Sequence, residues 1–293
     1  MTDLVTITSG ALTARINPLG AELWSLTDAE GAEYMTDADP AFWTGHAPVL
    51  FPIVGELNGG RYRLDGKPYA MKRHGFARTS VFTVAEAGAD IARFVLRDSD
   101  ETRAIYPFAF ELELAFHVEG TTLGVTATVT NRDERAMPFS IGLHPAFAWP
   151  LPGRAAKSDH RVTFAEAEPE PIRRLSIPAG LLLPETFPTP VDGHGFTPDA
   201  AMFAADAMMW DALNSRSVTF GPTAGTQVSV AFPDAPMLGI WQKVGAPFLC
   251  IEPWQGLADP VGFTGELSDK PGIVNLAPGG EHRFRVDVSL VSF

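Results

Sequence analysis

Apolar and polar side chains alternate along several stretches of the chain, with the period of two that a strand with one buried face produces. In residues 110–118 every even-numbered position is apolar, and after a turn at Glu119-Gly120-Thr121 every odd-numbered position of residues 123–129 is apolar. This arrangement predicts an antiparallel hairpin that buries one face. The same alternation appears in residues 228–232 and in residues 284–290. The chain is therefore predicted to be rich in antiparallel strands.

Glycine and proline separate these runs, as in an antiparallel sandwich or barrel. The chain has 27 Gly and 25 Pro among its 293 residues. Helical periodicity is scarce, and the best candidate is an Ala- and Met-rich segment from Asp199 to Leu213, with Asp199 as its N-cap. Residues 150–200 are rich in Pro and polar groups and predict long ordered loops. Because strand patterning resumes after them, we predict a single all-β domain over residues 1–293.

Composition and charge narrow the class of protein. The chain is 45% hydrophobic, ample for a large core, and no apolar run approaches the ~18 residues of a membrane helix. The start, Met1-Thr2-Asp3-Leu4, lacks the features of a signal peptide. The formal net charge of −13 repels phosphate backbones and anionic membranes, so we expect neither as a partner. The one cysteine, Cys250, excludes an intrachain disulfide and suits a cytoplasmic protein, whereas the oligomeric state is left open.

One carboxylate stands in an unusual place. The apolar run Phe248 to Ile251 is followed by Glu252 and then by Pro253-Trp254. Proline cannot donate to a sheet ladder, so we expect the strand to end or lose its pairing at Pro253. A glutamate at the end of a buried strand is costly unless it is paired or used in chemistry. The alternative is a glutamate that simply faces solvent.

A histidine stands in a similar place. His144 follows an apolar strand predicted from Met137 to Leu143 and precedes Pro145. Two strands that each finish in an ionisable side chain and a proline predict two such groups at the rim of one sheet. Imidazole beside carboxylate is what acid-base chemistry near neutral pH requires, since each tunes the pKa of the other. The alternative for His144 is a half-buried histidine bonded to backbone.

Two further sets of residues suit a polar ligand. His74 lies in the loop-like stretch Arg73 to Arg78, and its alternative is a loop histidine beside the basic Lys72-Arg73 pair. Aromatic side chains near the polar loops suit stacking on a sugar ring, although core packing is expected for at least half of them. These aromatic residues are Trp43, Phe76, Phe147, Trp149, Trp241 and Trp254.

Other chemistries have little support. The seven histidines show no metal-ligand spacing such as His-Glu-x-x-His, and no Gly-x-Ser-x-Gly motif is present. Cys250 lies in an apolar run, where a raised pKa makes a poor nucleophile. Gly-rich phosphate loops are absent, and Gly59-Gly60 is interpreted as a hairpin turn. We therefore predict a site with no metal and no cofactor.

Several of these motifs occur in an order that identifies a family. The sequence resembles the aldose 1-epimerase (galactose mutarotase-like) family, in particular its bacterial LacX-like branch, over essentially the whole chain. The stretches that carry the resemblance are Ile16 to Leu23, Pro48 to Gly55, His74 to Arg78, Gly142 to Phe147 and Cys250 to Trp254.

The resemblance implies a β-supersandwich and an isomerase that interconverts the α and β anomers of a free aldose without a cofactor. By position in the family motifs, Glu252 is the expected base on the C1 hydroxyl and His144 the expected acid on the ring oxygen. His74 and Arg78 are expected to bind the sugar. The partner implied is thus a small neutral hexose.

Two points stay open. A sugar-binding aspartate is expected near residues 206–211, with Asp206 preferred to Asp211. Hexose-6-phosphate epimerases of the same superfamily carry an Arg-Gly-Gly type stretch where this chain has Thr44 to Pro48, which argues against a phosphorylated substrate. Lys72, Arg73 and Arg78 keep a sugar phosphate as the second candidate, and a non-catalytic sugar-binding protein is the third.

Overall fold

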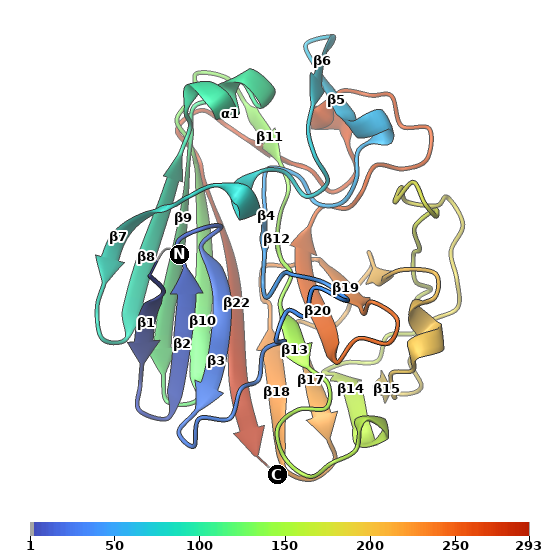
Figure 1. Ribbon diagram of the computed structural model, residues 1–293. Helices are drawn as coiled ribbons and strands as arrows, with labels where there is room; N and C mark the ends of the chain where they lie inside the picture. Colours follow the sequence, from blue (N-terminus) through green and yellow to red (C-terminus); the bar gives the residue numbers. More distant parts are fainter. Residues whose placement is uncertain (1–2, 293) are drawn as a thin grey trace.

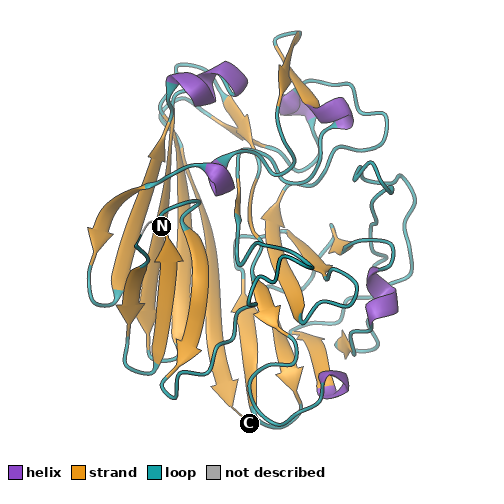
Figure 2. Ribbon diagram, in the orientation of Figure 1, coloured by secondary structure: helices purple, strands orange, loops and turns teal. Residues whose placement is uncertain are grey.

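The computed structural model describes residues 3–292. Met1 and Thr2 of the predicted start, and Phe293 at the limit of the predicted domain, therefore lie outside the described residues. Antiparallel sheets dominate the described chain, and its one α-helix is α1 (Asp100–Ile105) (Figures 1 and 2). No helix within residues 3–292 combines the length and the apolar character needed to cross a membrane. The all-β prediction is confirmed.

The largest sheet has nine strands and runs through the whole molecule (Figure 1). Neighbouring strands in it pair antiparallel. In spatial order the strands are β15 (Gly195–Phe196), β14 (His160–Phe164), β17 (Ser217–Pro222), β18 (Thr226–Ala231), β22 (Glu281–Ser292), β10 (Thr122–Asn131), β9 (Phe110–Glu119), β8 (Ile91–Arg97) and β7 (Thr83–Ala87).

Two smaller sheets cover different parts of this one (Figure 1). The first is a three-stranded sheet of β1 (Val5–Thr8), β2 (Leu12–Asn17) and β3 (Glu22–Asp28), which packs on β9 and β10. The second has the order β16 (Met208–Trp210), β19 (Met237–Trp241), β20 (Phe248–Gln255), β12 (Ile141–Leu143) and β4 (Val49–Leu50), and β13 (Ala146–Ala148) also pairs with β20.

The remaining elements are short. Two further strand pairs are β5 (Arg61–Leu64) with β6 (Lys67–Ala70), and β11 (Met137–Phe139) with β21 (Val274–Leu276). The 3-10 turns are η1 (Asn58–Gly60), η2 (Ala77–Thr79), η3 (Lys157–Asp159), η4 (Ala200–Phe203) and η5 (Leu267–Asp269).

The strongest patterns in the sequence became the centre of the nine-stranded sheet. The predicted hairpin is β9 and β10, whose register closes with Glu119 opposite Thr122. Gly120 in the turn has φ 55°, in the left-handed region that a residue without Cβ enters at no steric cost. The Ile16–Leu23 stretch, which carries part of the family resemblance, also forms a hairpin whose turn joins β2 to β3. The hairpin predicted from residues 110–129 is confirmed.

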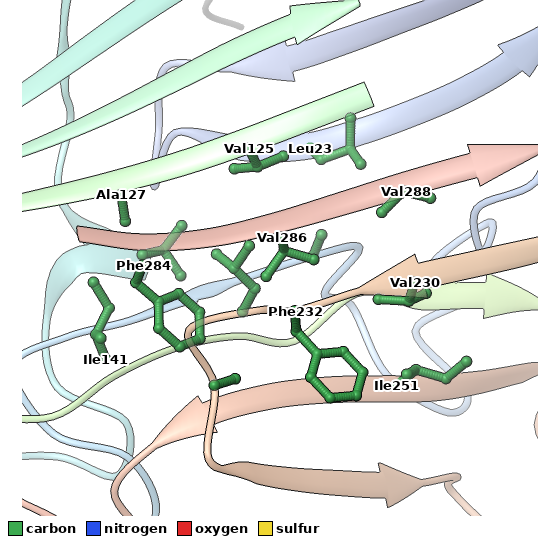
Figure 3. Packing of buried hydrophobic residues seen from close by; sticks show 14 of the residues in the cluster. Leu23, Val125, Ala127, Ile141, Val230, Phe232, Ile251, Phe284, Val286 and Val288 are labelled. Carbon is green, nitrogen blue, oxygen red and sulfur yellow. The ribbon is translucent and has the colours of Figure 1, made fainter. Parts of the chain in front are cut away.

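One part of the core lies where the nine-stranded sheet meets the sheet of β20, and another lies under the sheet of β1, β2 and β3. Phe232 lies beside Ile251 of β20, and Phe284 of β22 lies beside Ile141 of β12 (Figure 3). All four side chains are completely buried. Burying a side chain of this size stabilises the fold by about 1.5–3 kcal/mol relative to leaving it exposed. This interface therefore anchors the sheet that carries the candidate site.

The helix expected from Asp199 to Leu213 is wrong for most of its length. Only Ala200–Phe203 forms a helical turn, of 3-10 type, with the Asp199 side chain accepting from the Ala201 N–H at 2.7 Å, so the predicted cap is present. Residues Met208–Trp210 instead form β16 and pair with β19. Pairing with an existing sheet edge outweighs the weak helical preference of a short Ala- and Met-rich segment.

Three smaller expectations also need correction. Residues 150–200 contain β14 and β15 as well as long loops, so that segment is not loop alone. Gly59-Gly60 belongs to η1, and the hairpin turn lies between β5 and β6. The strand predicted from Met137 to Leu143 is split at Ser140 into β11 and β12, which belong to different sheets. For β11 and β12 the partner strands are distant in sequence, β21 in the first case and β20 in the second, so the local pattern does not show the break.

Candidate active site

His144 and Glu252 face each other across paired strands. Gly142 of β12 pairs with Trp254 of β20. Beyond a short break between β12 and β13, Ala146 of β13 pairs with Cys250 of β20, which keeps the same register. Continued across that break, this register places His144 opposite Glu252. Their side chains meet there, with His144 Nε2 3.0 Å from Glu252 Oε2.

The strand that carries Glu252 does not end at Pro253, contrary to the sequence prediction. β20 continues to Gln255, and Pro253 pairs with Leu238 of β19. The Ile251 N–H donates to the Pro145 carbonyl at 3.2 Å, so the odd-numbered residues of β20 direct their N–H groups toward β12 and β13. The N–H group that Pro253 lacks would therefore point toward β12, and its absence does not disturb the hydrogen bonds between β20 and β19.

Trp254 lies flat across the neighbouring strands because glycines flank it. A Cβ on Gly142 of β12 would lie 2.5 Å from Trp254 Cδ1, and a Cβ on Gly239 of β19 would lie 2.5 Å from Trp254 Cη2. Real side chains do not approach so closely, so both positions require glycine. Since Glu252 and Trp254 are two residues apart on one strand, they share a face, and the indole covers the sheet beside the carboxylate.

His74 is held by a reciprocal pair of hydrogen bonds to Gly55. The His74 N–H donates to the Gly55 carbonyl at 2.9 Å, and the Gly55 N–H donates to His74 Nδ1 at 3.0 Å. An acceptor at Nδ1 leaves the ring proton on Nε2, which is then the donor available to a ligand. The next residue, Gly75, lies so close to Phe51 that a Cβ there would be 2.2 Å from the Phe51 carbonyl oxygen. The loop therefore packs tightly and sets the ring position.

All five site residues predicted from the sequence line one cavity of about 290 Å³. These residues are His74, Arg78, His144, Asp206 and Glu252. They come from segments far apart in the sequence. The sequence prediction that His144 and Glu252 are presented together therefore agrees with the geometry. The two side chains are buried at the base of the cavity, however, and do not lie at an exposed rim of the sheet.

Burial shifts the ionisation of the two histidines and of the glutamate toward their neutral forms. Burial raises the pKa of Glu252 well above its usual range, with the Asp206 carboxylate acting in the same direction. Burial lowers the pKa of His144 to about 3 and lowers the pKa of His74 well below its usual value. A carboxyl that holds its proton and an imidazole that releases it, 3.0 Å apart, are arranged to exchange a single proton.

Aromatic rings surround His144. The ring of Trp43 lies 4.8 Å from the His144 ring, and Trp241 meets the same ring edge-on at 5.7 Å. Both tryptophans line the cavity, as does Trp254. The other three aromatic residues considered for stacking are buried in the core, namely Phe76, Phe147 and Trp149. The expectation that at least half would be core residues is confirmed.

The structure separates the two candidate aspartates. Asp206 lines the cavity, has φ 65°, and accepts from the Ala207 N–H at 2.8 Å through Oδ1. Asp211 lies instead in an ion pair with Arg173 at 2.9 Å and does not line the cavity. Asp206 is therefore the aspartate positioned to meet a ligand.

Two arginines enter the cavity from the His74 loop. Arg78 was expected there, and burial together with the Arg73 charge lowers its pKa. Arg73 also lines the cavity, and its Nε is buried without a hydrogen-bond partner. From the sequence, Arg73 was considered only for a phosphorylated sugar and as part of a basic pair, and it was not among the predicted site residues. Its place directly before His74 was the available signal, because neighbouring residues of one loop border the same cavity.

One group of side chains has the spacing of a metal site. Within residues 3–292, His144, Cys250 and Glu252 each offer a ligand atom, and these atoms lie within 4.8 Å of one another. Burial raises the pKa of the Cys250 thiol well above its usual value, which favours the protonated thiol, a poor ligand. The imidazole Nε2 and the carboxyl Oε2 already contact each other at 3.0 Å. The chemistry of this donor set suits proton exchange better than metal binding.

Comparison with known proteins identifies similar proteins of a single family. A family model described as aldose 1-epimerase matches residues 3–270. The plasmid and chromosomal forms of the protein LacX from Lactococcus lactis subsp. lactis are each 33% identical over 290 residues, covering 96% of this chain and 97% of LacX.

Solved structures agree. A galactose mutarotase related enzyme from Lactobacillus acidophilus superposes with a TM-score of 0.91 at 31% identity, covering 99% of this chain and 97% of that one. A galactose mutarotase-like protein from Lactobacillus casei superposes with a TM-score of 0.90 at 30% identity, covering 98% of this chain and 100% of that one. The chain belongs to the aldose 1-epimerase family.

Proposed function

We propose that this protein is a cofactor-independent aldose 1-epimerase that interconverts the α and β anomers of a free hexose. The observation that carries the proposal is the contact of 3.0 Å between His144 Nε2 and Glu252 Oε2 in the floor of a cavity walled by aromatic rings. A binding protein needs no buried acid-base pair, whereas anomer exchange needs one proton removed and one delivered. The single cysteine suits a cytoplasmic location, which we include in the proposal.

The reaction follows from the proton held by this pair. With the proton on His144, the Glu252 carboxylate removes the proton of the C1 hydroxyl as His144 protonates the ring oxygen. The C1–O5 bond breaks, C1 becomes a carbonyl, and the proton count of the pair is unchanged. Rotation about the C1–C2 bond presents the other carbonyl face. Ring closure then returns one proton from Glu252 to the C1 oxygen and takes one back to His144.

Ring opening starts from the less populated form of the pair, with the proton on His144, and in that form the raised pKa of Glu252 and the lowered pKa of His144 favour both proton transfers. A carboxylate of raised pKa is a stronger base, and an imidazolium of lowered pKa is a stronger acid. Each correctly placed acid or base contributes about 10²–10⁴-fold to the rate. No step requires a group from outside the chain.

The other cavity residues are assigned to binding. The His74 Nε2–H is the donor left free by the Gly55 hydrogen bond, and we assign it to the sugar near the ring oxygen. Arg78 donates to a hydroxyl, and Asp206 accepts from one. The rings of Trp43 and Trp241 offer flat apolar surfaces to the sugar ring.

The test is polarimetry on fresh α-glucose and α-galactose. Glu252→Gln keeps the shape of the side chain but removes the base, and we expect kcat to fall about 10²–10⁴-fold. The matched control is Glu113→Gln, which changes a surface glutamate paired with Arg93 at 2.8 Å and should leave the rate unchanged. Equal rates for Glu252→Gln and wild type would refute the assignment. Sugar binding without any acceleration by the wild type would favour the non-catalytic alternative.

A hexose 6-phosphate is the second candidate substrate. It is favoured by the Arg73 Nε, which is buried without a partner and lines the cavity together with Arg78. Two guanidinium groups form a recognised pattern for binding phosphate. Competition by inorganic phosphate and a higher kcat/KM for the 6-phosphate than for the free hexose would select this candidate.

A further inference from the structure

A buried ion pair that the proposed mechanism does not use lies beside the cavity. Lys270 Nζ lies 3.0 Å from Asp259 Oδ1, and the two residues are 2% and 3% exposed. Removing two charges from water costs about as much free energy as their attraction returns, so a buried pair is a weak source of stability. Replacing such a pair with apolar residues is often neutral. The contacts of this pair indicate a role other than stability.

Asp259 joins two segments that are far apart in the sequence. The Asn58 N–H donates to Asp259 Oδ2 at 2.9 Å, and the Asp259 N–H donates to the Glu56 carbonyl at 2.8 Å. Because Lys270 contacts the other carboxylate oxygen, both oxygens of Asp259 are engaged. Hydrogen bonds to an ionised acceptor are stronger than those between neutral groups. Asp259 therefore fixes the segment from Glu56 to Asn58.

This segment directly follows the residue that holds His74. Gly55 precedes Glu56, and its carbonyl and its N–H bond to the N–H and the Nδ1 of His74. Gly55 also packs against Ala258, the residue before Asp259, since a Cβ on Gly55 would lie 2.5 Å from Ala258 Cα. Both Gly55 and Ala258 line the cavity. Contacts therefore run without interruption from Asp259 through Gly55 to the His74 ring.

The pair also acts on His74 through charge. The Gly55 hydrogen bond needs an unprotonated Nδ1, because a protonated imidazole carries a hydrogen on both nitrogens. Burial lowers the pKa of His74 well below its usual value, and the positive charge of Lys270 acts in the same direction. Burial also lowers the pKa of Lys270, and the Asp259 carboxylate opposes this, which favours the charged lysine. The other charged or titratable groups that act on His74 are His144, Arg73 and Arg78.

We propose that Asp259 and Lys270 are positioning residues for the reaction, which together hold the His74 ring and keep it in the neutral form whose Nε2–H is available to the sugar. Neither residue lines the cavity, so neither is assigned a contact with the substrate. The inference rests on the proposed function, in which His74 binds the sugar near the ring oxygen. Asp259 supplies the geometry, and Lys270 supplies the charge.

Two double variants separate these contributions without leaving an unpaired buried charge. Asp259→Ala with Lys270→Met removes both, and we expect kcat/KM for a free hexose to fall about tenfold because the His74 ring is no longer held in place. Asp259→Asn with Lys270→Met keeps an acceptor for the Asn58 N–H, so kcat/KM near neutral pH should stay close to that of the wild type. On acidification, however, this variant should lose activity at a higher pH than the wild type, because no lysine charge opposes the protonation of His74.

Nitrogen NMR of the His74 ring provides a readout that does not depend on turnover. In the wild type we expect one neutral tautomer with its proton on Nε2, and in the variant with Asp259→Ala a mixture of both tautomers. The matched control is Glu113→Ala with Arg93→Met, which removes an exposed ion pair of 2.8 Å and should change neither readout. Circular dichroism gives the folded fraction of each variant. If the variant with Asp259→Ala does not fold, the variant with Asp259→Asn decides.

The outcomes distinguish this inference from the proposed function. Wild-type values of kcat/KM, of its acid limb and of the His74 ring signals in both double variants would overturn the inference and leave the proposed function standing. A loss of kcat/KM with unchanged ring signals and an unchanged acid limb would indicate a merely structural role and would also overturn it. If the wild type accelerates no sugar, the proposed function fails, and the ring signals alone decide whether the pair holds His74.

Discussion

The two faces of β20 differ in chemistry although both are buried. Leu249 and Ile251 point into the core between the sheets, whereas Cys250, Glu252 and Trp254 alternate with them on the face that holds the cavity. Burial on the core face stabilises the fold through apolar contact. Burial on the other face opposes the ionisation of Glu252 and so raises its pKa. The same loss of solvent thus gives stability on one face and reactivity on the other.

The comparison predicts opposite effects for adjacent residues. Ile251→Ala removes a completely buried core side chain and should lower the free energy of unfolding by about 2–5 kcal/mol. The folded fraction should keep kcat within a few-fold of wild type. Urea denaturation and polarimetry on the same samples measure both quantities. A loss of kcat as large as that expected for Glu252→Gln would show that the two faces are not separable.

Gly239→Ala probes the support of the cavity face. The added Cβ would lie 2.5 Å from the Trp254 ring, so either the indole or strand β19 must shift. We expect a loss of about 1–3 kcal/mol in stability, typical of overpacking, and a decrease of about tenfold in kcat/KM because Trp254 lines the cavity beside Glu252. Gly59→Ala is the control, because nothing lies within 4 Å of a Cβ there, although φ 65° adds backbone strain. An unshifted tryptophan fluorescence spectrum with unchanged kcat/KM would contradict the prediction.

The pH dependence of kcat/KM is the subtlest test. The reaction requires that His144 and Glu252 together hold one proton. Activity therefore falls at low pH, where both groups are protonated, and at high pH, where neither group is protonated. Burial lowers the pKa of His144 to about 3 and raises that of Glu252. The acid limb should therefore lie well below the ordinary histidine value of about 6.5. If kcat/KM of the wild type fell on acidification with a midpoint at pH 6.5, and His144→Asn removed that fall, the prediction that burial lowers the pKa of His144 would be contradicted.

At acid pH, kcat/KM must be measured together with the fraction of folded protein, because stability also falls there. The folded pKa values of His74 and His144 lie below their unfolded values, so below about pH 6.5 the unfolded state binds more protons and stability falls. Each such histidine costs on the order of 1 kcal/mol per pH unit in that window. Circular dichroism at each pH separates this loss of stability from a catalytic limb.

Local pattern was sufficient where each strand buries one face. The alternation in residues 110–118 and 123–129 predicted β9 and β10, because a period of two determines which side chains enter the core. The same reasoning located the strands at residues 228–232 and 284–290. It failed for Met208–Trp210, where pairing with β19 decided the conformation. It also failed at Pro253, because the direction of a missing N–H depends on which neighbour lies on that side.

By itself, the sequence determined that the chain is all-β and which residue types were available for acid-base chemistry. His144 and Glu252 could be selected because each follows an apolar run and precedes a proline, whereas the role expected of His74 came from the family resemblance. Only the tertiary structure decided that His144 and Glu252 are 3.0 Å apart, that Asp206 and not Asp211 lines the cavity, and that Arg73 lines it too. These facts depend on strand register and loop packing between residues far apart in the chain. No local pattern encodes such distances, because they arise only when the sheets assemble.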